Sequence, residues 1–198
     1  MKKRLYYLAL GIIVFLISYS IGAKVNIEKE QSSSIKEQFE TKIEGIDEFG
    51  IFQNNVLIAL SMFIPGIGVG VGIFSGFGTG LVFNAMALEN TTLQNISPLA
   101  ILLTPFGLME IFSYGVAISR SGMLIYDLYK KNSWKLMLKY TIIEIVITVS
   151  ILIVAAFIEW NMIKQLLEIP RWYVFMEIFC YSVAYKNIGY KIHNLNII

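Results

Sequence analysis

The sequence is poor in the residues from which most catalytic and metal centres are built. It contains one cysteine, Cys180, and one histidine, His193. A single cysteine cannot form a disulfide within the chain, and a single histidine argues against a histidine-based zinc site or catalytic dyad. We therefore expect a protein that is not an enzyme and that carries neither a metal nor another cofactor.

Charged residues are also scarce. They make up 15% of the chain, against 56% hydrophobic residues and a mean hydropathy of +0.65. Such a chain is far more apolar than an average soluble domain. The sequence therefore predicts an all-α integral membrane protein, a single polytopic helical bundle over residues 1–198. We expect its partners to be membrane lipid and either other membrane proteins of a complex or further copies of the chain, with no nucleic acid.

Six apolar segments are predicted to span the membrane, because about 20 apolar residues cross a bilayer core. The two clearest are 5–23 and 140–158, and the others are 49–64, 67–88, 106–126 and the shorter 172–185. The first segment also resembles a signal peptide, since a basic start precedes its apolar run. It is longer than a signal-peptide core, so we expect a retained anchor.

Basic residues indicate the orientation, because lysine and arginine stay on the cytoplasmic side in short loops. With six spans, three basic clusters fall on one side: Lys2, Lys3 and Arg4; Lys130, Lys131, Lys135 and Lys139; Lys186 and Lys191. Both termini are thus predicted in the cytoplasm, with the protein in the cell membrane. Two sequons, at Asn90 and Asn95, lie in loop 89–98 on the predicted outer side and are candidate glycosylation sites.

The segment between the first two spans is predicted to form an outer amphipathic helix over 34–48. Ser34 and Glu37 have the spacing of a capping box, and apolar residues such as Ile35 and Phe39 then recur at helical spacing. Two interpretations stay open. The helix either connects two spans while packing on its own bundle, or it presents a docking surface to a partner.

The third span is rich in glycine without containing a phosphate-binding loop, because no Gly-x-Gly-x-x-Gly or Gly-Lys-Ser/Thr pattern occurs in it. Instead, glycines recur at every fourth position: Gly68, Gly72, Gly76 and Gly80. Such spacing places small residues on one helix face, where a neighbouring helix can approach closely. The alternative is that some of them break the helix, as at substrate sites of transporters.

The next irregular stretch is predicted to be a short re-entrant or interfacial segment over 98–104. Pro98 and Pro105 flank an apolar segment that is too short to span. Pro105 and Gly107 then form a sharp turn into the fourth span. Non-helical backbone at membrane depth is tolerated where protein buries it, so this region should face the bundle interior.

Four charged residues fall within predicted spans, where an ionised group is costly and usually has a partner. Arg120 and Glu144 lie at comparable distances from the basic loop between their helices, which predicts an ion pair. The alternative is that both reach the inner interface independently.

Glu110 and Glu177 both enter from the outer side and are predicted to share a small polar pocket with Asn54 and Asn55. A cation or a proton could be held there. The alternative is that the two glutamates are uncharged and hydrogen-bonded within the bundle.

With these residues in view, the chain resembles the stage II sporulation protein M family over residues 49–127. The similarity rests on "FQNN", "SGFGTG" and "TPFGLMEIFSYGVAISRSG". The chain has Phe77-Gly78 where the family more often has Asn-Gly, and Pro105-Phe106-Gly107 where it has Pro-His-Gly. The resemblance implies a non-catalytic membrane scaffold or complex subunit, as such proteins look like scaffolds for a cell-wall-degrading partner in spore formers. The alternative is a transporter or permease subunit that uses the pocket near Glu110.

Overall fold

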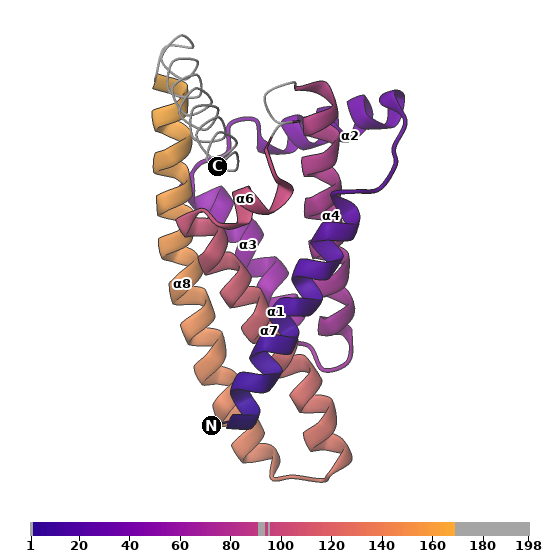
Figure 1. Cartoon of the computed structure of the whole chain (residues 1–198). Coiled ribbons are helices and arrows are strands. Elements are labelled where there is room, and N and C mark those ends of the chain that lie inside the picture. The colour runs from indigo at the N-terminus through magenta and orange to yellow at the C-terminus, as the bar shows by residue number, and fades with distance from the viewer. Residues whose placement is uncertain (1, 91–93, 95, 169–198) are drawn as a thin grey trace, which may run out of the picture. The chain divides into compact units, whose positions relative to one another are not determined.

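The computed structural model describes residues 2–90, 94 and 96–168, so the predicted span 172–185 lies outside the described residues. Seven helices and no strand occur in this part of the chain, and the all-α prediction is confirmed (Figure 1). Two compact units follow one another along the chain, residues 1–159 and 160–198.

Three helices are long and apolar enough to cross a membrane. They are α1 (Lys2–Gly22), α4 (Ile67–Glu89) and α8 (Trp134–Glu168). Helix α7 (Pro105–Tyr129) has 25 residues, but it carries charges within its length and does not join these candidate spans. Helix α3 (Glu48–Met62) has 15 residues, or about 22 Å of helix, which is shorter than a bilayer core of about 30 Å. The six-span arrangement therefore stays a prediction.

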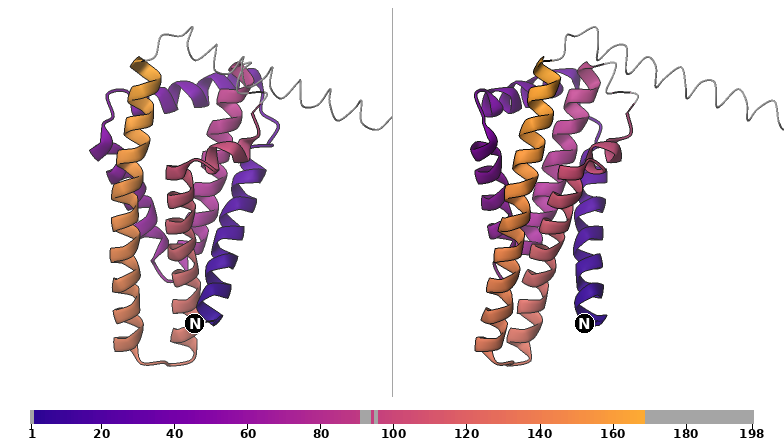
Figure 2. Two further views of the ribbon diagram at one scale, coloured as in Figure 1. Left: turned by 60° about the vertical axis from the view of Figure 1, so that its left-hand side comes forward. Right: turned by 90° about the vertical axis from the view of Figure 1, so that its left-hand side faces the viewer.

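The first unit is built around α1, α4 and α7, which pack against one another in pairs (Figure 2). Helix α3 packs against both α4 and α7. Side chains from these helices and from α8 form one buried core, whose largest members include Phe15, Tyr19, Met62, Phe83, Tyr114 and Leu152. No helix pair that includes α8 shows extensive close backbone approach within the described residues. Side chains such as Glu144 and Leu152 join α8 to the other helices.

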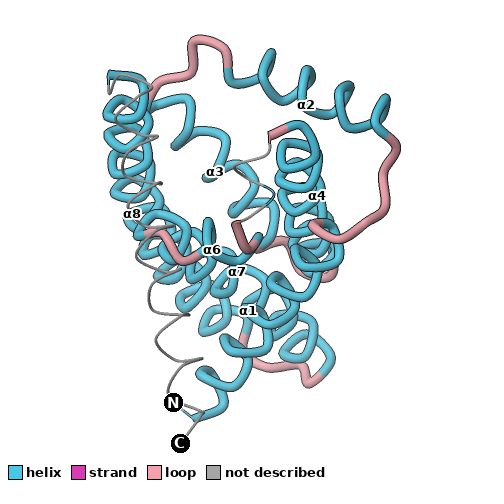
Figure 3. The backbone as a smooth tube through the Cα atoms, turned by 45° about the horizontal axis from the view of Figure 1, so that its top comes forward, coloured by secondary structure: helices cyan, strands magenta, loops and turns pink. Residues whose placement is uncertain are grey.

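The outer helix is found at a different place from the predicted 34–48, and that prediction was wrong in its bounds. Helix α2 covers Lys29–Ile43 and lies across the end of α4 (Figure 3). It begins earlier because Glu28 and Gln31 form a reciprocal capping box, in place of the predicted Ser34. It ends at Ile43, and Gly45 follows with a φ of 71°. Asp47 then caps α3 by accepting a hydrogen bond from the Gly50 amide at 2.8 Å.

The predicted interfacial segment contains a short helix, α6 (Pro98–Leu102), held against α1. The Tyr19 hydroxyl, on α1, donates a hydrogen bond to the Pro98 carbonyl at 2.8 Å. Helix α7 then begins directly at Pro105, where the Thr104 side chain accepts a hydrogen bond from the Gly107 amide at 3.2 Å. Gly107 is buried, and a Cβ there would lie 2.8 Å from the Ile101 carbonyl oxygen. Only glycine fits this turn without displacing α6.

Of the second unit, the structure describes Trp160–Glu168, which form the last turns of α8. The Lys164 ammonium there lies 5.0 Å from the centroid of the Trp160 ring, a distance typical of a cation–π contact.

Candidate functional site

The four regularly spaced glycines of α4 are all buried. Gly80 lies so close to α1 that a Cβ would collide with the Tyr19 carbonyl and the Ala23 amide. A Cβ at Gly76 would lie 2.9 Å from the Phe15 carbonyl oxygen. Helix α4 runs unbroken past these residues, so the glycines serve as contact points for α1 and leave the helix intact.

The other two glycines of this face meet different neighbours. A Cβ at Gly72 would collide with the Ile118 side chain of α7, and one at Gly68 with the Met62 carbonyl. The chain thus fills this face of α4 from within. The opposite side of the helix is different, because a Cβ at Gly70 or Gly78 would meet no atom of the described residues within 4 Å.

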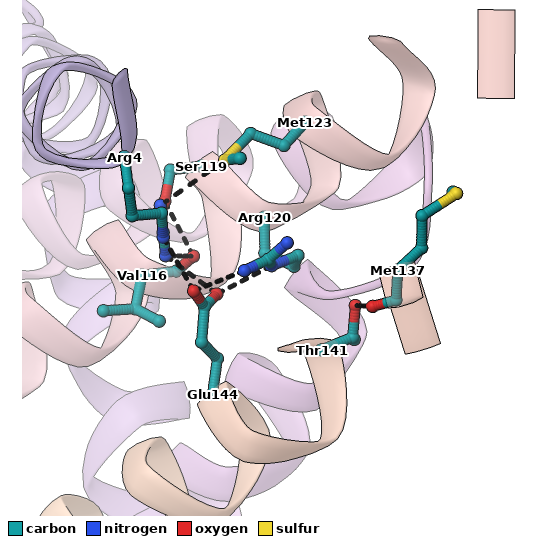
Figure 4. Close-up of polar contacts among 8 residues, drawn as sticks. All are labelled: Arg4, Val116, Ser119, Arg120, Met123, Met137, Thr141 and Glu144. Carbon is teal, nitrogen blue, oxygen red and sulfur yellow. Dashed lines mark hydrogen bonds and ion pairs between the residues drawn. The ribbon is translucent and has the colours of Figure 1, made fainter. Parts of the chain in front are cut away.

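A charged cluster ties three helices together at the end of the first unit that contains the chain's start (Figure 4). Glu144 Oε1 accepts hydrogen bonds from Arg4 Nε at 2.7 Å and from Arg120 Nη2 at 2.5 Å. Its Oε2 accepts from Arg4 Nη2 and Arg120 Nε, both at 2.8 Å. A carboxylate offers about four lone-pair sites, so Glu144 is fully occupied. Arg120 is 4% exposed and does not extend to the surface.

The remaining donors of Arg4 also find acceptors on α7. Its Nη1 donates to Ser119 Oγ at 2.5 Å and lies 3.9 Å from the Met123 sulfur, and its Nη2 donates to the Val116 carbonyl at 3.3 Å. The sequence predicted Arg4 only as a member of the basic cluster on the cytoplasmic side. The one feature of the sequence that could have predicted this role is its residue type. Arginine is the basic residue whose planar guanidinium donates two parallel hydrogen bonds to a carboxylate.

A second polar cluster joins α3 to α7. Asn54 Nδ2 donates to Asn55 Oδ1 at 3.1 Å, and Asn55 Nδ2 donates to Glu110 Oε1 at 2.5 Å. Asn55 is buried, with 9% of its surface exposed. Three of the four residues predicted for the polar pocket therefore form one hydrogen-bonded chain, and the fourth, Glu177, lies outside the described residues.

Another acid, Glu159 on α8, lies close enough to Glu110 for the two carboxylates to repel each other when ionised. Its Oε2 is buried and has no hydrogen-bond partner in the described part of the chain. The hydroxyls of Ser113 and Thr148 are also buried without a hydrogen-bond partner among the described residues. No group of three or more metal-ligating side chains occurs among residues 2–90, 94 and 96–168, so the cluster offers a proton or a single cation two carboxylates at most.

Helix α2 is fastened to the end of α4 by side-chain contacts. The buried Ser32 hydroxyl donates to the Ala85 carbonyl at 2.9 Å, and Ser33 donates to Glu89 at 2.5 Å. Lys36 also donates to Glu89, at 3.1 Å, and this hydrogen bond raises the pKa of Lys36. Of the two sequon asparagines, Asn90 follows α4 directly and is exposed, whereas Asn95 lies outside the described residues.

The family model of stage II sporulation protein M matches residues 6–161, which is most of the chain. The chain belongs to that family. No curated protein and no solved structure matches it.

In this stage II sporulation protein M family member, the motifs that suggested the resemblance meet in space. The asparagines of "FQNN" contact the glutamate of "TPFGLME" through the Asn55–Glu110 hydrogen bond. Gly107, in the same motif as Glu110, packs against α6. The arrangement joins α3 to α7 through a hydrogen bond and brings α6 against the start of α7.

We expect Asn55→Ala to lower the free energy of unfolding by about 1–3 kcal/mol, because it removes the donor that faces a buried carboxyl group. Asn54→Ala is the matched control, since Asn54 only donates to Asn55 and should cost less. Thermal unfolding in detergent measures both. Equal losses of unfolding free energy in the two variants would show that the Asn55–Glu110 hydrogen bond stabilises the protein no more than the Asn54–Asn55 hydrogen bond does.

Proposed function

We propose that this protein is a non-catalytic membrane scaffold, or a subunit of a larger membrane complex, that binds another membrane helix on the open side of α4. The observation that carries this proposal is the second glycine face. Gly70 and Gly78 leave open space beside the helix, and Phe74 between them is 79% exposed. Small residues that flank a protruding aromatic ring allow a partner helix to approach its backbone and to pack around the ring.

The outer helix supports the same proposal from outside the membrane. Its buried Ser32 fixes it on α4, while Glu37, Glu40 and Glu44 are exposed. These carboxylates would attract a partner with a basic surface. A bundle that presents an open helix face and a fixed acidic helix is suited to holding partners in place.

We infer further that both termini are cytoplasmic and that the protein has six spans. The start of α1 and the basic loop after α7 lie at the same end of the first unit, because Arg4 and Arg120 both contact Glu144. Helices α2 and α6 lie toward the other end (Figure 1). The basic clusters at the start of α1 and in the loop after α7 thus share one end, as the charge rule requires for the cytoplasmic side.

The scaffold proposal is tested by a photo-reactive amino acid at Phe74 in the full-length protein, cross-linked in native membranes. We expect one discrete protein adduct, identified by mass spectrometry as another membrane protein or as a second copy of this chain. Gly78→Leu in the same protein should abolish the adduct, because a bulky side chain separates the helices.

The matched control carries the same photo-reactive group at Val146 of α8, which is 58% exposed on a helix without a glycine face. We expect only lipid adducts there. Lipid adducts alone at Phe74, or the same protein adduct at both positions, would refute docking on α4.

A second candidate function, a transporter or permease subunit, is favoured by the Asn55–Glu110 hydrogen bond and the neighbouring Glu159. Carboxylates inside a bundle are typical of ion or proton pathways. Ion or solute flux across liposomes that contain the purified protein alone, and its loss in Glu110→Gln, would favour this function over the scaffold.

A further inference from the structure

A groove of about 640 Å³ runs along α1 and is closed on one side by α6. Its volume lies within the range of pockets that hold small molecules. The side chains that line it include Ile13, Leu16, Ile17, Ile21, Lys24 and Leu99. The Tyr19–Pro98 hydrogen bond fixes the α6 wall beside α1, so the groove is a built feature of the fold.

The groove is apolar along its length and basic at one end. Its hydroxyl, Ser20, donates to the Leu16 carbonyl of its own helix and is therefore satisfied. Lys24 stands where α1 ends, is exposed, and has no ion-pair partner in the described part of the chain. Lys24 is thus the one lining group with charge to offer a ligand.

The length of the groove matches one leaflet of a bilayer. The helical rise from Ile13 to Gly22, where α1 ends, is about 14 Å, and half of a hydrocarbon core is about 15 Å. Isoleucines 13, 17 and 21 are each at least half exposed toward this space. The structure therefore provides an apolar channel as long as an acyl chain, which ends at a cation at the depth of lipid headgroups.

We propose that this groove binds one anionic phospholipid, from the leaflet on the side of α2. One acyl chain lies along α1 against Leu99, and the phosphate pairs with Lys24. A zwitterionic lipid would offer the same acyl chain, but its own ammonium would compete with Lys24 for the phosphate.

Native mass spectrometry of the full-length protein tests the site, with phosphatidylglycerol and phosphatidylcholine as probes after delipidation. We expect one phosphatidylglycerol molecule to bind more tightly than phosphatidylcholine. Lys24→Gln should weaken phosphatidylglycerol binding about fivefold and leave phosphatidylcholine binding unchanged. Leu99→Trp, which fills the groove, should weaken both lipids.

Lys42→Gln is the matched control, because Lys42 is exposed on α2 and does not line the groove. It should bind both lipids as the unaltered protein does. Equal affinity for the two lipids, or equal losses in Lys24→Gln and Lys42→Gln, would overturn the proposal. So would tight binding of glycerol phosphate alone, since that probe has no acyl chain. Thermal unfolding of each variant without lipid shows that a lost lipid does not reflect a lost fold.

Discussion

Glu144→Gln is expected to lower the free energy of unfolding by about 3–5 kcal/mol, the range measured when one partner of a buried ion pair is removed. The variant leaves the guanidiniums of Arg4 and Arg120 facing each other without a carboxylate. It also weakens the attachment of α8, which Glu144 joins to α1 and α7. Unfolding in mixed detergent micelles measures the loss.

Glu89→Gln is the matched control, because Glu89, the last residue of α4, pairs with Lys36 of α2 at the surface. Exposed pairs contribute little, so its unfolding midpoint should stay almost unchanged. The triple variant Arg4→Leu, Arg120→Leu and Glu144→Leu should recover part of the Glu144→Gln loss, since apolar residues often replace a buried ion pair at little cost. Equal effects of Glu144→Gln and Glu89→Gln would mean that water, and not the arginines, solvates Glu144.

Gly80→Ala is the second large effect that we expect, with a loss of about 3 kcal/mol at the upper end of the usual cost of overpacking. The added methyl group would collide with the Tyr19 carbonyl and the Ala23 amide of α1. Backbone atoms cannot rotate away as a side chain can, so the two helices must separate. Thermal unfolding of the purified protein measures the change.

Gly78→Ala gives the comparison on the same helix, two residues away. A methyl group at Gly78 meets no atom within 4 Å in the part of the chain that the structure describes, and alanine favours helix formation over glycine. Its midpoint should be unchanged or higher in purified protein. A similar loss of stability in Gly78→Ala and Gly80→Ala would show that α4 requires glycine at both positions for a reason other than the contact with α1.

The helices themselves could largely be predicted from the length of each apolar segment. The predicted bounds were wrong where capping residues or charged residues determine where a helix begins and ends. Helix α4 agrees closely with the predicted 67–88. The predicted span 140–158 is only the middle of α8, because polar residues continue the helix at both ends without contributing hydropathy. The bounds of α2 were missed because Ser34 has the spacing of a capping box, yet Glu28 and Gln31 form the one that is used.

The candidate site could be predicted where two residues lie at the same depth in the membrane on helices that a short loop joins. Arg120 and Glu144 lie equally far from the loop that joins their helices, and the structure holds them in one cluster. Arg4 could not be placed in this way, because its position depends on how α1 packs and not on its distance along the chain. Glu159 was missed because the predicted span ended one residue before it.

The Arg4–Glu144 contact also has a consequence for biosynthesis. Arg4 on α1 is synthesised well before its carboxylate partner, which follows 140 residues later. Arg120 precedes the same carboxylate by only 24 residues, so α7 and α8 can enter the bilayer as a hairpin that already contains an ion pair. Until then both arginines are without their acceptor. A chain that stops before α8 therefore presents unpaired cations within its helices, and cellular quality control could recognise an incomplete protein by them.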